Sequence, residues 1–442
     1  MTDYKALYAK KLISAEELAK QVESGWILGM DTAPSQAPAI MNAIAARVKS
    51  SDIKGVQVQT LLDAYPFEFY TDPDMFGKMT GYSWFSSGYA RKAINGGWAD
   101  LLPTYYRDIP RHIRAEYEYD AFCIEVTPMD SHGYFSLALN GSYAEAMIDK
   151  AKRVFVEVNE NQPRCLCGTQ LHVSQVDAIV EYNHELPVLP PVAIDEVSQT
   201  IGNLIAEQIP DGACIQLGIG AIPDATGMAL KSKHDLGIHT EMFTDSMVEL
   251  IECGAVNNSK KQIHRGKSVT TFAYGSKRIY DYVDDNPAIE ILPVDYVNNP
   301  EVICKNDNMI SINAAIEVDF FGQVCAESVG TKHMSGSGGQ IDFVRGACQS
   351  KGGKSFICMS STVTGKDGTV KSRIVPTLTP GSICTDPRSC THYIVTEYGM
   401  VNLKGLSTWQ RAEALIGIAH PDFREQLIAD AEKMHIWRRS NK

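Results

Sequence analysis

Short apolar runs alternate with amphipathic stretches along most of the chain. The apolar runs are rich in β-branched residues and bounded by glycine, proline or polar residues, which predicts strands. The first helix is predicted from a capping box, Ser14 to Glu17, with Leu18 and Val22 on one face. Alternation of this kind is typical of βαβ units and a mostly parallel sheet. The predicted strands are 25–30, 56–61, 122–126, 154–158, 213–217, 238–243, 269–273, 289–293, 309–314, 355–359, 373–378 and 393–397.

A proline-rich segment near the middle of the chain predicts a domain boundary. Residues 185–191 read ELPVLPP, and their three prolines stiffen the backbone and end regular structure on either side. We therefore expect an N-terminal α/β domain over 1–186 and a C-terminal one over 187–442.

A weak internal repeat suggests that the two halves fold alike. Residues 26–34 resemble 215–223 in a Leu-Gly pair followed by an apolar residue and a proline, and the Ile-Glu-Val of 124–126 recurs at 316–318. The predicted fold class is α/β, with two similar open domains of mostly parallel sheets flanked by helices. Only the second half keeps a glycine-rich loop, because Asp31 stands where the second half has Gly220, and Asp31 would repel an anionic ligand.

Charge and cysteine content exclude several classes of protein. The chain has 41 Lys and Arg against 53 Asp and Glu, a net charge of −12, which argues against binding to nucleic acid. No apolar run approaches the roughly 18 residues of a membrane span, and the first residues do not form a secretory signal, so we expect a cytoplasmic protein without membrane contact. The 11 cysteines include no CxxC pair, which favours reduced thiols and predicts no metal site.

Two glycine-rich segments are candidates for ligand binding. In 216–225, Gly218 and Gly220 lie between a predicted strand and a predicted helix, and Pro223 suits the first helical turn. Such a loop presents amides and a helix N-terminus to an anion or an oxyanion, although a simple tight turn has the same pattern. In 335–343, five small residues precede Gln340, Asp342 and Phe343, which fits either a mobile linker or an ordered loop against a ligand.

Glu241 is the candidate for chemistry. It lies in HTEMFTDS, 239–246, at the end of a predicted strand, where open α/β sheets bind ligands, and Thr244 or Asp245 would cap the next helix. A carboxylate there can act as a base, a metal ligand or a nucleophile, or it can be a solvated surface group.

Taken together, five ordered motifs resemble the acetyl-CoA hydrolase/transferase family, and within it the 4-hydroxybutyrate and butyryl-CoA:acetate CoA-transferases. They are QLGIGAIPDA (216–225), HTEMFTDS (239–246), NNPEVI (298–303), GSGGQIDFVRGA (336–347) and TEYGMVNLKG (396–405). Segments 124–137, 157–164, 172–177 and 411–427 extend the resemblance over nearly the whole chain. One departure is Ser246, where relatives usually carry glycine.

The resemblance implies an enzyme that exchanges CoA between a short acyl-CoA, such as 4-hydroxybutyryl-CoA or butyryl-CoA, and a carboxylate such as acetate. Glu241 would be the nucleophile, through an acyl-glutamyl anhydride and a glutamyl-CoA thioester. The resemblance further implies a homodimer with no permanently bound cofactor. An acyl-CoA hydrolase on the same scaffold and a non-catalytic CoA-binding protein are the alternatives. The residues expected to contact CoA are Gly218, Ile219, Gly220, Ala221, Ile222, Ile316, Gly338, Gly339, Asn298 and Asn299.

Overall fold

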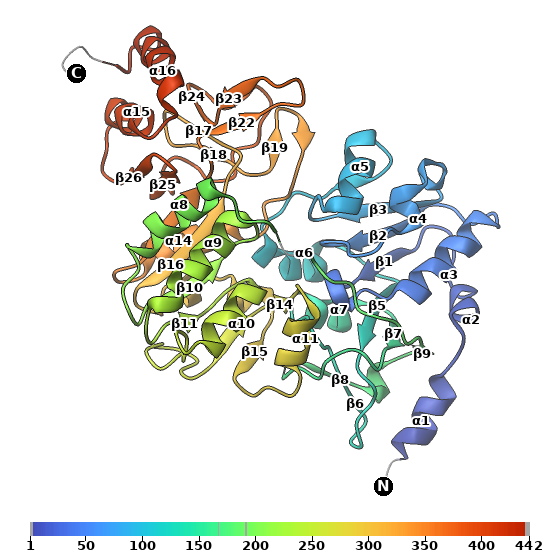
Figure 1. The fold of residues 1–442 in the computed structure, drawn as a ribbon. Coiled ribbons are helices and arrows are strands. Elements are labelled where there is room, and N and C mark those ends of the chain that lie inside the picture. The colour runs from blue at the N-terminus through green and yellow to red at the C-terminus, as the bar shows by residue number, and fades with distance from the viewer. Residues whose placement is uncertain (1–2, 167, 191, 438–442) are drawn as a thin grey trace. The chain divides into compact units, whose positions relative to one another are not determined.

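A computed structural model describes residues 3–166, 168–190 and 192–437 (Figure 1). The chain divides into two compact units. Unit 1 comprises Met1–Pro190, Glu241–Asp245 and Val269–Val297, and unit 2 comprises Pro191–Thr240, Ser246–Ser268 and Asn298–Lys442. The expected boundary between 186 and 187 stays a prediction, and in this division Glu241 belongs to unit 1.

Unit 1 is built on a seven-stranded parallel sheet with the order β4-β3-β2-β1-β5-β7-β9 (Figure 1). Its strands are β1 (Ile27–Met30), β2 (Val56–Thr60), β3 (Met79–Ser83), β4 (Asp100–Leu101), β5 (Ala121–Val126), β7 (Val154–Val158) and β9 (Ala178–Glu181). Its helices in the N-terminal segment are α1 (Tyr4–Lys11), α2 (Ala15–Ala19), α3 (Pro38–Lys49), α4 (Glu68–Thr71), α5 (Gly88–Gly96), α6 (Ile109–Glu116) and α7 (Ala144–Lys150).

Successive residues of β1 face opposite sides of the sheet of unit 1, and both sides are covered. Leu28 and Met30 share one hydrophobic core with Ile40 of α3. Gly29 faces the other way, where an added Cβ would lie 2.7 Å from the sulfur of Met147 in α7. Both faces of the strand are therefore buried, as expected for a parallel sheet flanked by helices.

The predicted capping box is confirmed. Ser14 Oγ accepts a hydrogen bond from Glu17 N at 3.1 Å, and Glu17 Oε2 accepts one from Ser14 N at 3.4 Å. Helix α2 begins directly afterwards at Ala15 and buries Leu18. It is not the first helix, because α1 precedes it, and it ends at Ala19, so Val22 lies beyond it.

Unit 2 contains a six-stranded sheet with the order β11-β10-β16-β21-β25-β26, parallel except for β26. The strands are β10 (Cys214–Leu217), β11 (Gly237–Ile238), β16 (Met309–Ala314), β21 (Lys354–Cys358), β25 (Tyr393–Thr396) and β26 (Gly399–Asn402). The helices that lie wholly in unit 2 are α8 (Glu196–Ala206), α9 (Ala221–Ala229), α13 (Pro300–Ile303), α14 (Gln340–Gln349), α15 (Thr408–Gly417) and α16 (Pro421–Lys433).

The two sheets share a strand order, as the predicted repeat requires. Across the sheets, the neighbouring strands β2-β1-β5-β7-β9 of unit 1 correspond to β11-β10-β16-β21-β25 of unit 2. The first pair of repeated segments fits, because its Leu-Gly lies within β1 in one unit and at the end of β10 in the other. The second pair was wrongly matched, because 124–126 lie in β5 whereas 316–318 follow β16.

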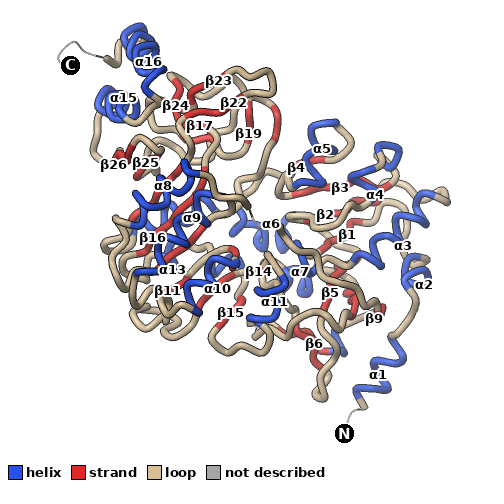
Figure 2. The backbone as a smooth tube through the Cα atoms, viewed as in Figure 1, coloured by secondary structure: helices blue, strands red, loops and turns tan. Residues whose placement is uncertain are grey.

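Smaller sheets replace several strands that the sequence predicts as continuous. The stretch 238–243 is split into β11 and β12 (Met242–Phe243), because β11 pairs with β10 while β12 pairs with β14 (Phe272–Ala273). The stretch 269–273 is likewise split into β13 (Ser268–Thr270) and β14. Short strands and loops make up most of 317–375 (Figure 2). They are β17 (Glu317–Asp319), β18 (Val324–Cys325), β19 (Ser328–Val329), β20 (Lys332–His333), β22 (Thr362–Thr364), β23 (Val370–Ser372) and β24 (Ile374–Val375).

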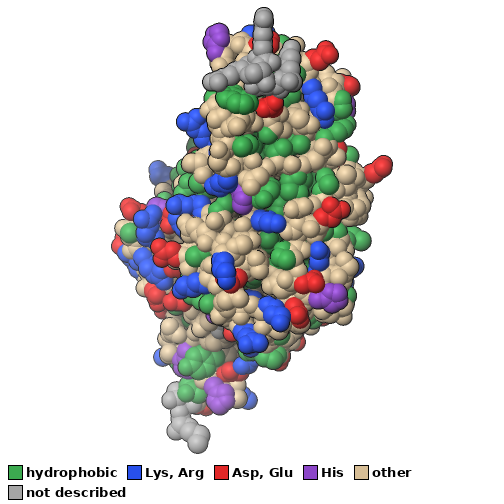
Figure 3. Space-filling model, turned by 90° about the vertical axis from the view of Figure 1, so that its left-hand side faces the viewer, with side chains coloured by type: hydrophobic (Ala, Val, Ile, Leu, Met, Phe, Trp, Pro, Cys, Tyr) green, Lys and Arg blue, Asp and Glu red, His purple; other side chains and the backbone are tan. Residues whose placement is uncertain are grey.

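The remaining elements lie near Glu241 in the sequence or within unit 1. They are β6 (Tyr134–Ser136), β8 (Gln170–His172), α10 (Asp245–Glu252), α11 (Lys277–Val283), β15 (Ile289–Ile291) and α12 (Val294–Val297). In the described part of the chain, the helices are too short or too polar to cross a membrane. Acidic and basic side chains are interspersed over the face drawn in Figure 3.

Helix α9 is held against α8 by a backbone contact at Gly202. A Cβ on Gly202 would lie 2.8 Å from the backbone carbon of Ala225 and 2.8 Å from the nitrogen of Thr226. Both are backbone atoms, so neither can move without shifting helix α9. We expect Gly202→Ala to lower the free energy of unfolding by about 1–3 kcal/mol, the usual result of overpacking. Urea unfolding measures the change.

Gly417→Ala is the matched control for this substitution. Gly417 is the exposed last residue of α15, and an added Cβ would meet nothing within 4 Å. Alanine there is expected to leave stability unchanged or to raise it by up to about 1 kcal/mol. Equal effects of the two substitutions would contradict the packing argument.

Candidate functional site

The backbone at Glu241 is fixed at the break between β11 and β12. Its carbonyl oxygen accepts hydrogen bonds from Thr271 N at 3.0 Å, Phe272 N at 3.3 Å and Thr270 Oγ1 at 2.9 Å. The residue is neither buried nor fully exposed. The predicted carboxylate therefore stands on a rigid bend between two short strands, not at the end of one continuous strand.

Buried polar side chains of unit 1 surround this bend. The hydroxyl of Tyr106 lies 2.6 Å from Ser142 Oγ, and its ring packs edge-on against Phe272 at 6.3 Å. Burial, and then the negative charge of Glu241, raise the pKa of Tyr106 well above its ordinary value. The carboxylate of Glu241 thus acts electrostatically on a buried phenol.

A second buried pair lies on the same side of unit 1. Asn140 donates a side-chain hydrogen bond to Asp31 Oδ1, which also accepts one from Thr32 N at 2.9 Å. Burial raises the pKa of Asp31 to about 7, against the effect of these two donors. Sequence reasoning noticed Asp31 only as the counterpart of Gly220, and it missed Tyr106, Asn140 and Ser142 because no spacing pattern marks them.

The residues after Glu241 begin helix α10. Asp245 is its first helical residue, so of the two predicted caps, Thr244 or Asp245, it is Thr244 that stands directly before the helix. Asp245 Oδ2 accepts a hydrogen bond from Ser276 N at 3.0 Å. Ser246 packs against α9, where a Cβ on Gly227 would lie 3.0 Å from the Cβ of Ser246. The serine at this position is therefore accommodated by a glycine on the facing helix.

The first glycine loop precedes α9, as predicted. Gly218 N donates to Ile312 O at 2.8 Å, and a Cβ there would crowd Asn313 Oδ1 at 3.1 Å. Gly220 has φ +127°, and it is the N-cap of α9 with no side-chain cap. Ile219 is 53% exposed, while Ala221 and Ile222 are partly exposed. Gly220 has no side chain with which to cap the backbone donors of this helix N-terminus, an arrangement that suits an anion.

The second glycine loop is ordered and precedes α14. Ser337 Oγ donates to Glu327 Oε2 at 3.2 Å, and the backbone amides of Met334 and Ser335 bond to the carbonyl of Glu327. Gly338 has φ +52°, and Gly339 is the N-cap of α14 without a side-chain cap. Of the two alternatives for this segment, the ordered loop is the one observed.

The other predicted contact residues also belong to unit 2. Ile316 lies between β16 and β17, where its N donates to Cys325 O at 2.8 Å. Asn298 is buried, and Asn299 caps α13 by accepting a hydrogen bond from Glu301 N at 2.9 Å. The cap gives Asn299 a structural role. All predicted CoA contacts therefore lie in unit 2, and Glu241 lies in unit 1.

One group of three possible metal ligands occurs among the described residues, and two of its members lie in the segments 124–137 and 157–164. Glu125, Glu157 and His184 bring their ligand atoms within 4.8 Å of one another. His184 Nε2 lies 2.6 Å from Glu125 Oε2, whereas two donors on one ion lie roughly 3 Å apart or more. The contact fits a charge-assisted hydrogen bond better than a shared ion.

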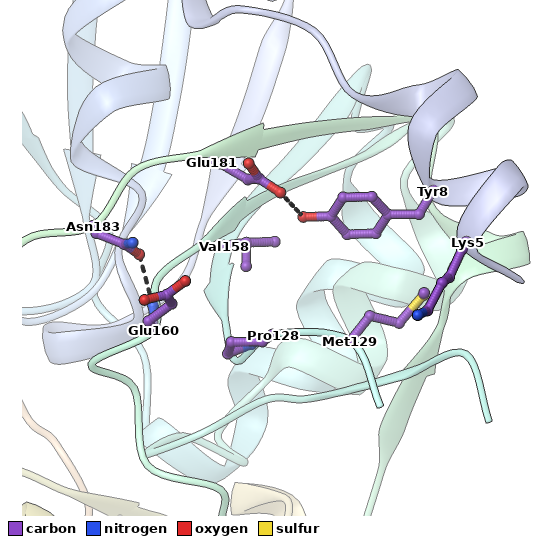
Figure 4. Close-up of a pocket in the computed structure, with 8 residues that line it drawn as sticks. All are labelled: Lys5, Tyr8, Pro128, Met129, Val158, Glu160, Glu181 and Asn183. Atoms are coloured by element: carbon purple, nitrogen blue, oxygen red, sulfur yellow. Dashed lines mark hydrogen bonds between the residues drawn. The ribbon is translucent and has the colours of Figure 1, made fainter. Parts of the chain in front are cut away.

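Two cavities of unit 1 are lined by none of the predicted site residues. One, of about 290 Å³, lies beside α1, where Tyr8 points toward Glu181 and donates to its Oε1 at 2.7 Å (Figure 4). The other, of about 430 Å³, is bordered by α11 and the segment 160–163. Neither contains a nucleophile beside a glycine loop.

Comparison with known proteins identifies the class as enzymes of the CoA-transferase type. The model of the acetyl-CoA hydrolase/transferase N-terminal domain matches 1–190, and that of the C-terminal domain of the same family matches 275–431. The chain belongs to the acetyl-CoA hydrolase/transferase family.

Individual relatives support this assignment over nearly the full length. The butyryl-CoA:acetate CoA-transferase of Anaerostipes caccae is 46% identical over 99% of this chain and 100% of its own length. The 4-hydroxybutyrate coenzyme A transferase of Clostridium kluyveri is 43% identical, covering 98% of this chain and 99% of that protein. The crystal structure of RipA from Yersinia pestis matches with a TM-score of 0.92 at 40% identity, over 98% of this chain and 100% of that one.

Proposed function

We propose that this enzyme transfers CoA between a short acyl-CoA or hydroxyacyl-CoA and acetate, with Glu241 as covalent nucleophile. The names of two close relatives, a butyryl-CoA:acetate CoA-transferase and a 4-hydroxybutyrate coenzyme A transferase, support the substrate class. The observation that carries the choice of Glu241 is its rigid backbone at a strand break, with the carboxylate acting on buried Tyr106.

The reaction conserves the activation of the thioester. The carboxylate of Glu241 attacks the acyl carbonyl, a C–O bond forms, and the C–S bond breaks to release CoA thiolate and leave a mixed anhydride. The thiolate then attacks the glutamyl carbonyl, which forms a glutamyl-CoA thioester and releases the acyl carboxylate. Acetate reverses both steps and leaves as acetyl-CoA. A carboxylate is already ionised at neutral pH, so no general base is required.

Each step passes through a tetrahedral oxyanion, which backbone donors must stabilise. We assign this task and CoA binding to the glycine loops, because Gly220 and Gly339 both begin helices without side-chain caps. Water must be kept from the anhydride, because hydrolysis would waste the intermediate. In this proposal the partition between transfer and hydrolysis depends on that exclusion.

Intact-mass measurement tests the proposal. Wild-type protein incubated with butyryl-CoA or 4-hydroxybutyryl-CoA should gain the mass of CoA less one water, because a thioester forms on Glu241. Added acetate should discharge the adduct as acetyl-CoA. Glu241→Ala should gain no mass, because no other group forms this thioester.

The remaining outcomes distinguish the alternatives. CoA released steadily without acetate would identify an acyl-CoA hydrolase. Binding of acyl-CoA without adduct or turnover in the wild type would identify a non-catalytic CoA-binding protein. An adduct that persists in Glu241→Ala would place the nucleophile elsewhere.

A further inference from the structure

Two buried polar atoms of unit 1 lack partners near Glu241. Asp31 and Asn140 are fully buried, and they bond to one another through Asp31 Oδ1 and Asn140 Nδ2. The other terminal oxygens, Asp31 Oδ2 and Asn140 Oδ1, have no hydrogen-bond partner among the described residues. Leaving a buried polar atom without a hydrogen-bond partner is costly, so the pair requires an explanation.

Backbone contacts connect Asn140 to Glu241. Asn140 forms a β-bridge with Phe272, and Gly141 N donates to Thr271 O at 2.8 Å. Thr271 N in turn donates to Glu241 O. A Cβ on Gly141 would lie 2.7 Å from Leu292 O, so this short connection cannot shift to make room for a side chain.

Asp31 is connected to Glu241 through Tyr106, because the charges of both carboxyl groups affect this tyrosine. The pKa of Tyr106 is raised first by burial, then by the charge of Glu241 and also by that of Asp31. The carboxyl groups of Glu241 and Asp31 therefore both lie within electrostatic range of the buried phenol of Tyr106, which is hydrogen-bonded to Ser142. The neighbourhood of the nucleophile is polar and buried, whereas an apolar acyl chain is best matched by an apolar wall.

We propose that Asp31 and Asn140 form a subsite for the hydroxyl group of a short hydroxyacyl chain carried on Glu241. The inference rests on the proposed function. The subsite would favour a hydroxyacyl-CoA over an unsubstituted acyl-CoA of the same length. A hydroxyl both donates and accepts, so it can donate to Asn140 Oδ1 or Asp31 Oδ2. An unsubstituted acyl chain leaves both oxygens unpaired.

When Asp31 is protonated, it can also donate a hydrogen bond to the hydroxyl group of the substrate. Because burial raises its pKa to about 7, Asp31 is partly protonated at neutral pH, and its carboxyl can then donate to the hydroxyl oxygen. In the ionised form it accepts from the hydroxyl and repels a second carboxylate on the acyl chain. The subsite therefore also disfavours dicarboxylic acyl groups such as succinyl.

Competition between acyl groups tests the subsite, with acetate as acceptor throughout. The wild type should show kcat/KM for 4-hydroxybutyryl-CoA roughly 10- to 100-fold above that for butyryl-CoA, as one or two satisfied hydrogen bonds predict. Asp31→Ala should reduce this ratio to near one. Asp31→Asn should keep most of the preference, because an amide still bonds to a hydroxyl.

Asp120→Asn is the matched control. Asp120 directly precedes β5, the strand beside β1, and accepts a hydrogen bond from Ile27 N at the start of β1 at 2.9 Å, whereas Asp31 follows the last residue of β1. Its replacement should leave the ratio unchanged. The ratio is taken within each variant, so partial misfolding cancels, and the wild-type ratio alone tests the inference if Asp31→Ala does not fold.

An active wild type that uses butyryl-CoA as well as 4-hydroxybutyryl-CoA would overturn the subsite. Absence of turnover and of any adduct on Glu241 with every acyl-CoA would instead overturn the proposed function.

Discussion

Glu241→Gln should lower kcat for CoA transfer by about 10³-fold or more, the scale seen when a covalent nucleophile is removed. Glutamine keeps the size and hydrogen-bonding shape of the side chain but is not a nucleophile toward a thioester. The backbone bonds to Thr270, Thr271 and Phe272 do not involve the side chain, so the fold should persist. Initial rates of acetyl-CoA formation from 4-hydroxybutyryl-CoA and acetate measure the effect.

Two further variants make this test sharper. Glu241→Asp retains the carboxylate but withdraws it by one methylene, and a displacement of about 1 Å can cost about 10²-fold in rate. Glu207→Gln removes an exposed carboxylate at the end of α8 and should leave kcat unchanged. If Glu241→Gln retains more than a tenth of the wild-type rate, covalent catalysis through Glu241 is wrong.

The parts of the fold that the sequence predicts correctly depend on local signals. The capping box at Ser14, the proline in the first turn of α9 and the glycines before α9 and α14 act within a few residues. The parallel sheets follow from apolar runs that are long enough to be buried on both faces. These signals need no information about distant parts of the chain.

The parts that the sequence could not predict depend on distant partners. The run 238–243 is apolar enough for one strand, but its ends pair with β10 and with β14, so the strand breaks beside Glu241. The buried polar neighbours of Glu241 are likewise brought together from far apart, with Asp31 and Asn140 separated by 109 positions. A single buried Asn or Asp carries no periodic pattern, so composition and spacing do not distinguish it from a surface residue.

The buried group formed by Glu125, Glu157 and His184 gives the second prediction. Glu125 and Glu157 are paired neighbours on β5 and β7, and both are fully buried. Burial, and then the charge of Glu125, raise the pKa of Glu157 to about 8, although the backbone amides of Ile40 and Ala39 oppose the shift. Burial acts to lower the pKa of His184, but its hydrogen bond to Glu125 raises it overall.

Both shifts make the folded state bind protons more tightly than the unfolded chain. The stabilisation is fully present below the unfolded pKa, about 4.5 for the glutamate and 6.5 for the histidine, and it is lost as pH rises through the folded values. The contribution of this group should therefore fall between pH 5 and pH 9. Each unit of raised pKa corresponds to about 1.4 kcal/mol, so the fall is on the order of several kcal/mol.

Glu125→Gln should reduce this pH dependence, because it removes the charge of Glu125 while the burial of Glu157 remains. The amide oxygen can still accept from Asn159 and Gln162, as Glu125 Oε1 does at 3.0 and 2.7 Å, and the amide nitrogen can donate to His184 Nε2. His184 Nδ1 lies 2.9 Å from the carbonyl of Glu185, so the neutral ring can keep its proton on that side. One buried charge disappears, which removes the second cause of the raised pKa of Glu157 and the hydrogen bond to a carboxylate that raises the pKa of His184.

The comparison with wild type should therefore change sign with pH. Near pH 5.5 the variant lacks a charge-assisted hydrogen bond and should be less stable by about 1–3 kcal/mol. Near pH 9 Glu157 has lost its proton beside Glu125, so the wild type holds two neighbouring buried carboxylates and the variant should be equally or more stable. Urea unfolding from pH 5.5 to 9 measures this difference, with Glu118→Gln as control. Glu118 is exposed and ion-paired with Lys150, and its pKa is lowered, so its effect should be flat over this range. Parallel curves for wild type and Glu125→Gln would show that the buried group does not exchange protons between pH 5.5 and 9.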